Sequence, residues 1–243
     1  MKTAMKTIGL LGGMSWESTS SYYRALNEGI KARLGGLHSA KIAMVSMDFH
    51  DIEVLQRSGD WAATAVILAD AAKQVQAAGA DFLLICTNTM HKVADEVAAA
   101  VDIPLLHLAD ATGQRLQDNG IKTVGLLGTR FTMEQDFYKQ RLVDNFGLNV
   151  LVPNLQGIEL VHNVIYDELC LGQIMDESRS GYLQIIDSLH ERGAEAVILG
   201  CTEIALLIKQ QHTNMPLYDT TAIHCEAAVD HALDAQPVKR AKE

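Results

Sequence analysis

Cys201 is the residue of this sequence whose surroundings are most suited to chemistry. It follows an apolar segment that ends at Gly200, and it precedes Thr202 and Glu203. A helix that begins at Thr202 or Glu203 would place free amides and partial positive charge beside the thiol, and would lower the thiol pKa below its usual ~8.5. A thiolate in such a position is a nucleophile or a base. The alternative is that Cys201 is a small buried residue in a tight turn, as most unpaired cysteines are.

An internal repeat supplies a second polar turn of the same kind. Three segments recur in the same order at nearly constant separation, which indicates a duplicated unit of roughly half the chain. The matching pairs are Thr7–Gly12 with Thr123–Gly128 (116 residues apart), Gly79–Ile85 with Gly193–Leu199 (114 apart) and Ile103–Leu105 with Met215–Leu217 (112 apart).

The 114-residue offset superposes Thr87 on Cys201. The same offset places Asn88 on Thr202 and Thr89 on Glu203. Two equivalent turns related by an approximate two-fold axis would face one another across the cleft between the halves. A bound molecule would then meet a thiol on one side and a hydroxyl on the other.

The elements that position these turns alternate between strand and helix in each half. A short apolar strand leads through a glycine turn into an amphipathic helix, and a second helix ends at a glycine before a buried strand and a polar turn. The expected segments are strands 8–11, 82–85, 124–127 and 196–199, helices 61–78 and 180–192, and helices opened by Ser15–Ser18 and by the capping box Thr132–Gln135.

This alternation predicts an α/β fold with two similar three-layer αβα domains, mainly parallel sheets and a pseudo-two-fold relation. We expect residues 5–105 plus 218–237 to form the first domain and residues 106–217 to form the second. Residues 1–4 and 238–243 are expected to be flexible termini. Ligands of such sheets bind beyond the carboxyl ends of the strands.

Several polar residues at these strand ends are candidates for substrate binding. Asn88, Thr89 and Thr202 could hold a carboxylate at helix N-termini, or they could be helix N-caps. His91 lies one helical turn after Thr87 and is as compatible with a surface position as with a site. The two glycine turns add the candidates Met14, Ser15, Thr129 and Thr132.

Composition excludes several other classes of function. A formal charge of −10 and a pI near 5.3 argue against nucleic-acid binding. The sequence has no apolar run of about 20 residues for a membrane span and no signal peptide, so we expect a cytoplasmic protein. It also has no metal-ligand spacing, no dinucleotide-binding fingerprint and no lysine context for pyridoxal phosphate, so no cofactor is expected. Cys86 is expected to point into the sheet, and Cys170 and Cys225 are interpreted as structural.

Three motifs resemble the aspartate/glutamate racemase family: Leu10–Ser15, Thr87–His91 and Gly200–Glu203. The resemblance extends over essentially the whole chain and includes Gly128-Thr129 and Ile165–Leu169. Glutamate racemases of cell-wall synthesis usually carry His at the position of Glu203, so the aspartate-racemase branch is more similar. The resemblance makes Glu203 a further candidate for substrate binding.

The family resemblance implies a two-base reaction without a cofactor. One thiolate removes the α-proton of an amino acid and a second thiol returns a proton to the opposite face. It implies that Cys201 acts on the L-enantiomer, whereas Thr87 occupies the position of the first family cysteine. A hydroxyl is a poorer base than a thiol, but it can relay a proton directly or through water. Aspartate-handling members also tend to carry an Arg and a Lys where this chain has Glu53 and Cys170, and Arg57 could substitute.

The sequence therefore predicts a racemase independent of pyridoxal phosphate, with L-aspartate or L-glutamate as the expected substrate. A single-cysteine decarboxylase or isomerase of the same superfamily and a non-catalytic module that binds a small acid remain alternatives. The expected partner is a small amino acid, with no nucleic acid or membrane, and a homodimer is left open.

Overall fold

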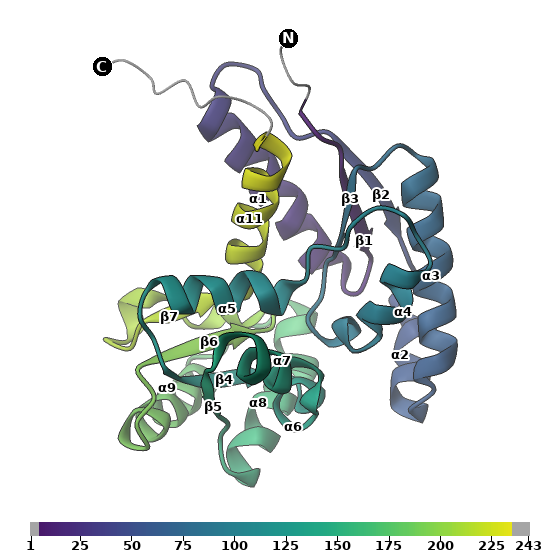
Figure 1. Ribbon diagram of the computed structural model, residues 1–243. Helices are drawn as coiled ribbons and strands as arrows, with labels where there is room; N and C mark the ends of the chain where they lie inside the picture. Colours follow the sequence, from purple (N-terminus) through teal and green to yellow (C-terminus); the bar gives the residue numbers. More distant parts are fainter. Residues whose placement is uncertain (1–4, 235–243) are drawn as a thin grey trace, which may run out of the picture.

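The structure is a computed structural model that describes residues 5–234, and it contains two parallel β-sheets flanked by helices (Figure 1). The first sheet has the order β2-β1-β3, and the second has the order β5-β4-β6-β7. The strands are β1 (Ile8–Gly12), β2 (Ile42–Ser46), β3 (Phe82–Ile85), β4 (Thr123–Gly128), β5 (Asn149–Leu151), β6 (Ala196–Gly200) and β7 (Leu217–Asp219). The predicted α/β class with parallel sheets is confirmed.

The two sheets repeat one pattern. In each, the first strand of the unit lies between the second and third, and all registers are parallel. Leu105 forms an isolated parallel bridge with Leu83 at the edge of the first sheet, and Leu217 pairs with Val197 at the same edge of the second. The internal repeat seen in the sequence therefore corresponds to a repeat in the strand order.

Helices cover both faces of the first sheet because its strands are apolar on both sides. Ile8 and Leu10 of β1 pack beneath one pair of helices, and Leu11 packs against the opposite layer. The first pair is α1 (Trp16–Leu34) and α11 (Thr220–Leu233), and the opposite layer contains α2 (Phe49–Ser58), α3 (Trp61–Ala77), the 3-10 helix η1 (Thr89–Val93) and α4 (Ala94–Ala99).

The second sheet is covered in the same way. Val124 and Leu126 of β4 pack on one side, and Leu127 packs on the other. One layer holds α5 (Leu108–Asp118) and α7 (Asp136–Phe146), and the other holds α8 (Leu155–Asp167) and α9 (Asp176–Glu191). The shorter elements are α6 (Arg130–Glu134), η2 (Leu169–Leu171), α10 (Ile204–Leu207) and η3 (Gln210–His212).

The chain crosses between the units twice. It enters the second unit before α5, and it returns through α11, which packs along α1 (Figure 1). Tyr218 and Asp219 belong to β7 of the second sheet, although residue 218 was expected to begin the return to the first domain. The expected flexible termini, residues 1–4 and 238–243, and the end of the first domain at 235–237 lie outside the described residues.

Local sequence signals explain where the helices begin. The Ser15 hydroxyl caps α1 by accepting the Ser18 N–H, as the sequence suggested. The expected capping box at Thr132 is wrong, because Thr132 lies inside α6 and Thr129 caps that helix by accepting the Thr132 N–H. Gly79 and Gly193 have φ values of 89° and 98°, which explains glycine after α3 and α9.

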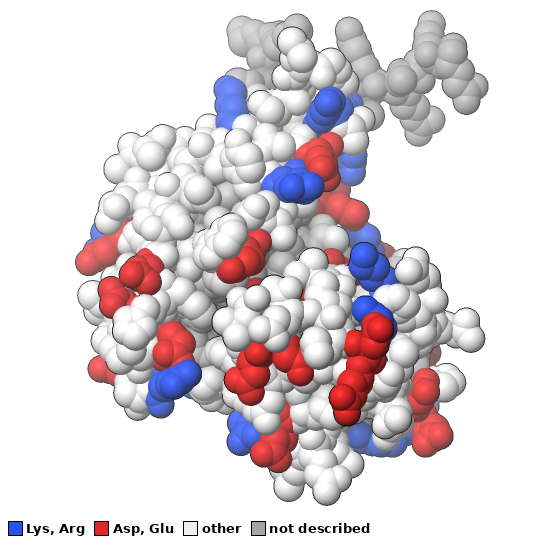
Figure 2. Space-filling model, turned by 180° about the vertical axis from the view of Figure 1, so that it is seen from behind, with Lys and Arg blue, Asp and Glu red and all other residues white. Residues whose placement is uncertain are grey.

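Within residues 5–234, none of the helices is long and apolar enough to cross a membrane. Acidic and basic side chains are interspersed over the face of the molecule seen in Figure 2. The same described residues contain no group of three or more His, Cys, Asp or Glu side chains placed to hold a metal ion.

Candidate active site

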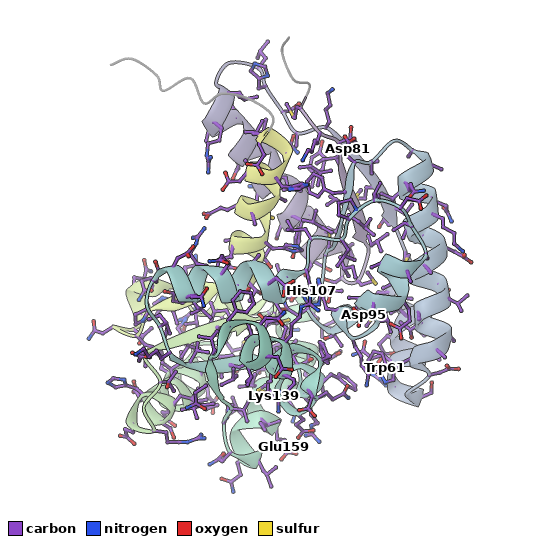
Figure 3. All side chains as sticks on the ribbon, in the orientation of Figure 1. Trp61, Asp81, Asp95, His107, Lys139 and Glu159 are labelled. Atoms are coloured by element: carbon purple, nitrogen blue, oxygen red, sulfur yellow. The ribbon has the colours of Figure 1, made fainter. Side chains whose placement is uncertain are left out.

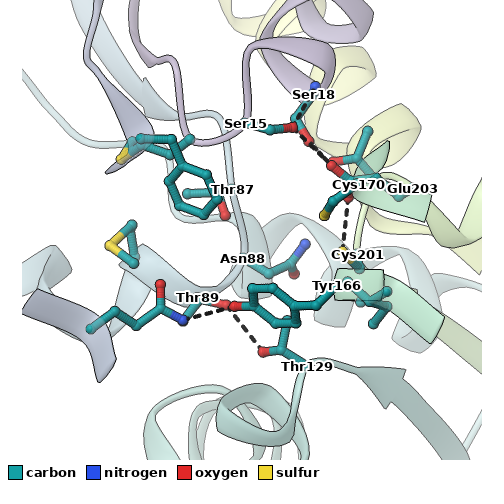
Figure 4. Close-up of a pocket in the computed structure, with 17 residues that line it drawn as sticks. Ser15, Ser18, Thr87, Asn88, Thr89, Thr129, Tyr166, Cys170, Cys201 and Glu203 are labelled. Carbon is teal, nitrogen blue, oxygen red and sulfur yellow. Dashed lines mark hydrogen bonds between the residues drawn. The ribbon is translucent and has the colours of Figure 1, made fainter. Parts of the chain in front are cut away.

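A cavity lies between the two units, at the carboxyl ends of the central strands (Figure 4). Strands β1, β3, β4 and β6 each run into a polar turn at this edge. Residues from both units line the cavity: Met14, Ser15, Ser18, Phe49, Gln56, Thr87, Asn88, Thr89, Met90, Thr129, Ile165, Tyr166, Cys170, Gly200, Cys201, Thr202 and Glu203. In this view Thr87 lies to the left of Cys201, and the Asn88 side chain lies between them.

Glu203 connects the Cys201 thiol to the first unit. The thiol donates to Glu203 Oε2 at 2.8 Å. The hydroxyls of Ser15 and Ser18 donate to Glu203 Oε1 at 2.9 and 3.0 Å. Because each carboxylate oxygen has a partner, Glu203 is held by the start of α1 and is only 4% exposed. Glu203 thus lines the cavity, as the sequence suggested for a substrate-binding residue, and its carboxylate also accepts the hydrogen bond of the Cys201 thiol.

The pKa of Cys201 is raised well above the usual value of a thiol. The main cause is loss of solvation on burial, and the Glu203 carboxylate adds to it by electrostatic repulsion of the thiolate. The expected lowering by a helix N-terminus is wrong, since α10 has only four residues and starts at Ile204. The thiol therefore rests protonated and needs an acceptor before it can act as a base.

Asn88 presents an unpaired acceptor in this cavity. Its amide Nδ2 donates to Thr220 Oγ1 at 3.2 Å, and the Thr220 hydroxyl donates its single proton to the Leu199 carbonyl at 2.9 Å. Thr220 can therefore only accept from Asn88, which fixes the amide orientation. Asn88 Oδ1 is buried without a hydrogen-bond partner, a costly arrangement that a ligand N–H would relieve.

His91 supports the Thr87 turn from behind. Its Nδ1 lies 2.8 Å from the Thr87 carbonyl oxygen, and its Nε2 accepts the Leu108 N–H at 3.2 Å. Both ring nitrogens are thus used, and the ring packs edge-on against His107, which lies where the two units meet (Figure 3). Burial lowers the pKa of His91 to about 4. His91 braces the turn and is not among the residues that line the cavity.

Three of the threonine candidates line the cavity, and the fourth is buried beneath them. Thr89 Oγ1 lies 3.2 Å from Thr129 Oγ1, and both residues line the cavity. Thr132 is fully buried beneath them and contacts Thr129 Oγ1 at 3.2 Å. Thr202 lines the cavity and hydrogen-bonds to Thr221 at the start of α11. Thr132 therefore supports the site without reaching it.

Arg57 does not line this cavity, in contrast to the sequence prediction. Its side chain is 78% exposed and forms an ion pair with Glu53 one helical turn earlier. It lines a second hollow farther out, between α2 and α8. Among the residues that line the inner cavity, Glu203 is the sole charged side chain. The inner cavity therefore offers no Lys, Arg or His to pair with a substrate carboxylate.

Sequence reasoning missed several lining residues. Ser18, Gln56 and Tyr166 contribute hydrogen-bonding groups, and Gln56 Nε2 donates to the Tyr166 hydroxyl at 3.0 Å. Cys170 also lines the cavity, and burial raises its thiol pKa to about 12. The sequence signal for Ser18 was its position one turn after the Ser15 N-cap. Gln56, Tyr166 and Cys170 lie outside the segments that the internal repeat matches.

The remaining cysteines agree with their structural interpretation. Cys86 is fully buried in the core beneath α1 and α11, where burial raises its pKa. Cys225 lies in the same core. Although Cys86 directly precedes Thr87, it points away from the cavity into the sheet.

Comparisons with known proteins agree on one family. The family model described as Asp/Glu/hydantoin racemase matches residues 11–228. A broad specificity amino-acid racemase of Bacillus subtilis is 22% identical over 174 residues, covering 69% of this chain and 71% of that protein.

Solved structures give the same result. A candidate Asp/Glu racemase from Yersinia pestis is 53% identical with a TM-score of 0.90, over 94% of this chain and 100% of the other. An aspartate racemase homologue from Pyrococcus horikoshii OT3 is 33% identical with a TM-score of 0.82, over 94% and 99% of the two chains. The similarity thus extends through both units and the cleft between them.

Proposed function

The chain belongs to the Asp/Glu/hydantoin racemase family, and we propose that it is a cofactor-independent amino-acid racemase in which Cys201 and Thr87 transfer the protons. One observation carries the proposal: Thr87 and Cys201 line the same cavity from equivalent strand ends of the two units. Racemisation needs an acid/base group on each face of the Cα, and this pair meets that requirement.

Glu203 provides the acceptor that the protonated thiol requires. Transfer of the thiol proton to Glu203 Oε2 leaves a thiolate at Cys201, which then removes the α-proton of the L-amino acid. The electron pair of the broken C–H bond becomes a carbanion delocalised into the α-carboxylate. The Thr87 hydroxyl donates its proton to the opposite face of the carbanion. The proton held by Glu203 then passes through water to the Thr87 alkoxide, which completes inversion and leaves the Glu203 carboxylate ionised again.

The cavity also offers groups for the α-substituents of the substrate. The unpaired Asn88 Oδ1 is suited to accept from the α-ammonium group. The hydroxyls of Thr89 and Thr202 are suited to donate to the α-carboxylate as negative charge spreads into it, with Thr129 donating to Thr89 and Thr221 donating to Thr202. These groups are oriented before the substrate binds. Because they need little reorganisation in the transition state, they lower the activation barrier for proton transfer.

The charge of the cavity favours a substrate with an uncharged side chain over the expected aspartate or glutamate. An amino acid with a neutral side chain is a zwitterion and brings no net charge to a site that already holds the Glu203 carboxylate. A second substrate carboxylate would be desolvated beside Glu203 without a cationic partner, at a cost of several kcal/mol.

The test is an amino-acid panel assayed for optical inversion and for α-deuterium uptake in D₂O, using protein dialysed exhaustively against chelator. We expect inversion of L-amino acids with uncharged side chains and its loss in Cys201→Ser. Ligand binding without deuterium uptake for any amino acid would contradict the proposal and would favour a decarboxylase or a binding module.

A further inference from the structure

A second hollow lies against the proposed reaction cavity, between α2 of the first unit and α8 of the second. Its volume is about 240 Å³. We call it the outer chamber, and its lining residues are Glu53, Gln56, Arg57, Phe131, His162, Asn163, Tyr166 and Asp167. Gln56 and Tyr166 also line the inner cavity, so these two side chains form the partition between the hollows.

The partition is held by a single hydrogen bond. Gln56 Nε2 donates to the Tyr166 hydroxyl at 3.0 Å, and among residues 5–234 this is the sole side-chain hydrogen bond between α2 and α8. A neutral hydrogen bond between two side chains contributes little net stability, because each group can bond to water instead. The other walls are held more firmly, since Glu203 accepts three hydrogen bonds and Asn88 is tied through Thr220 to β6.

The Gln56–Tyr166 partition bounds the inner cavity on the side of the outer chamber. A substrate with its Cα between Cys201 and Thr87 places its α-ammonium and α-carboxylate groups among the polar side chains of this cavity. A long side chain then extends to a wall of the cavity, and the wall held by the fewest hydrogen bonds is the Gln56–Tyr166 partition.

The chemistry of the outer chamber suits a polar, uncharged end group. Glu53 and Arg57 neutralise one another, which leaves Asp167 as a carboxylate with no ion pair among the described residues. Burial lowers the pKa of His162, so this ring is neutral at pH 7. Asn163 and Tyr166 offer further donors and acceptors. A carboxamide can both donate and accept here, whereas a second carboxylate would be repelled by the chamber's net negative charge.

We propose that the outer chamber receives the substrate side chain when Gln56 and Tyr166 separate, which makes the enzyme selective for long, polar, uncharged side chains such as that of glutamine. This inference rests on the proposed racemase function and adds the substrate class. Gln56 and Tyr166 then act as specificity-determining residues, because the side chain passes between them.

The experiment measures α-deuterium uptake by three L-amino acids: glutamine, its near-isostere glutamate, and alanine, whose side chain ends before the partition. We expect the wild type to exchange glutamine about tenfold or more faster than glutamate. Equal rates, or faster exchange of glutamate, would overturn the proposal. Exchange of none of the three would instead contradict the racemase function itself.

A bulky substitution in the outer chamber tests binding of the substrate side chain separately from the proton-transfer step. Asn163→Trp fills the outer chamber from α8, and we expect the ratio of glutamine to alanine exchange to fall about tenfold or more. The matched control Asn145→Trp, on the exposed face of α7, should leave the ratio unchanged. Equal loss on both substrates, with an unchanged melting temperature, would make the chamber an entrance only and would overturn the side-chain assignment.

A charge variant tests the same assignment without risk to the core. Asp167 is exposed, so Asp167→Asn should fold normally. Removal of its negative charge should raise glutamate exchange relative to glutamine by about two- to fivefold, a modest effect because solvent screens the site. An unchanged ratio would contradict the placement of the substrate side chain in the outer chamber, which Asp167 lines.

Discussion

At the scale of single residues, the proton on the Cys201 thiol and the charge of Glu203 are coupled. The carboxylate accepts the thiol hydrogen bond at 2.8 Å and also raises the thiol pKa. The hydrogen bond supports catalysis because it gives the thiol proton an acceptor. The raised pKa, in contrast, slows the reaction of the thiol with alkylating reagents. A substitution that removes the charge alone can separate them.

We expect Glu203→Gln to make Cys201 more easily alkylated while it impairs catalysis. Loss of the negative charge lowers the thiol pKa, and a shift of about one unit gives about tenfold faster reaction with iodoacetamide at pH 8. Exchange of the α-proton should fall, because the amide cannot accept the thiol proton. Glu168→Gln is the control, since Glu168 hydrogen-bonds to Ser178 and not to Cys201. Unchanged alkylation in Glu203→Gln would contradict the coupling.

The sequence was sufficient to identify Cys201, Thr87 and Asn88 as cavity residues, because the internal repeat superposes their two turns. It could not give the direction of the pKa shift of Cys201. That direction depends on burial of the thiol and on Glu203 turning back toward it, and residue spacing encodes neither. Residue spacing likewise could not show that His91 and Thr132 lie outside the lining of the cavity.

At the scale of elements, the Thr87 turn and the start of α5 are joined by one side chain. His91 contacts the Thr87 carbonyl and accepts the Leu108 N–H, so it links a turn of the first unit to a helix of the second. Its neighbour His107 caps α5 by accepting the Ala109 N–H and has no hydrogen bond to Thr87. The two histidines are therefore similarly buried, but His91 is hydrogen-bonded to the Thr87 turn and His107 is not.

We expect His91→Phe to reduce optical inversion more than α-deuterium uptake from the L-amino acid. The substitution releases the Thr87 turn, on which protonation of the opposite face depends, but leaves Cys201 and Glu203 in place. His107→Phe should lower both rates in proportion, if at all, as a general loss of stability would. Parallel loss of inversion and uptake in His91→Phe would show that the bridge is structural only.

The strands and the turns at their ends were predictable because hydrophobic runs and glycines mark them in both halves. Helices α2 and α8, which supply Gln56 and Tyr166, lie outside the segments that the repeat matches. Their side chains meet only when the two units face one another. Contacts of this kind between different elements leave no periodic signal in the sequence, and neither did the approach of Cys170 to the cavity.

At the scale of the whole molecule, buried histidines occupy the junction between the units. Burial lowers the pKa of His91 to about 4 and that of His224 to about 3. His224 contacts Tyr22 of α1 through Nδ1 and the Leu106 carbonyl through Nε2. The rings of His91 and His224 lie 6.0 Å apart. Both crossings of the chain are therefore fixed by neutral imidazoles.

We expect the free energy of unfolding to fall as the pH is lowered from about 6.5 toward 4. The unfolded chain binds protons at these histidines near pH 6.5, whereas the folded chain binds them only near their lowered pKa values. Each buried histidine thus contributes stability that is present above about pH 6.5 and is lost by up to about 1.4 kcal/mol per pH unit below it. Urea unfolding at pH 7.5, 6 and 5 measures this. A flat profile, or one that His224→Gln leaves unchanged, would contradict the assignment.

The central claim is that Cys201 and Thr87 transfer protons on opposite faces of one Cα. The most direct measurement follows α-deuterium uptake and optical inversion together in D₂O, for an L-amino acid that the wild type inverts. Thr87→Ala should still take up deuterium with retention of configuration, because Cys201 can remove and return a proton on its own face, but should form almost no D-enantiomer. Cys201→Ala should do neither. Inversion by Thr87→Ala at the wild-type rate, or deuterium uptake by Cys201→Ala above about a tenth of the wild-type rate, would contradict the account.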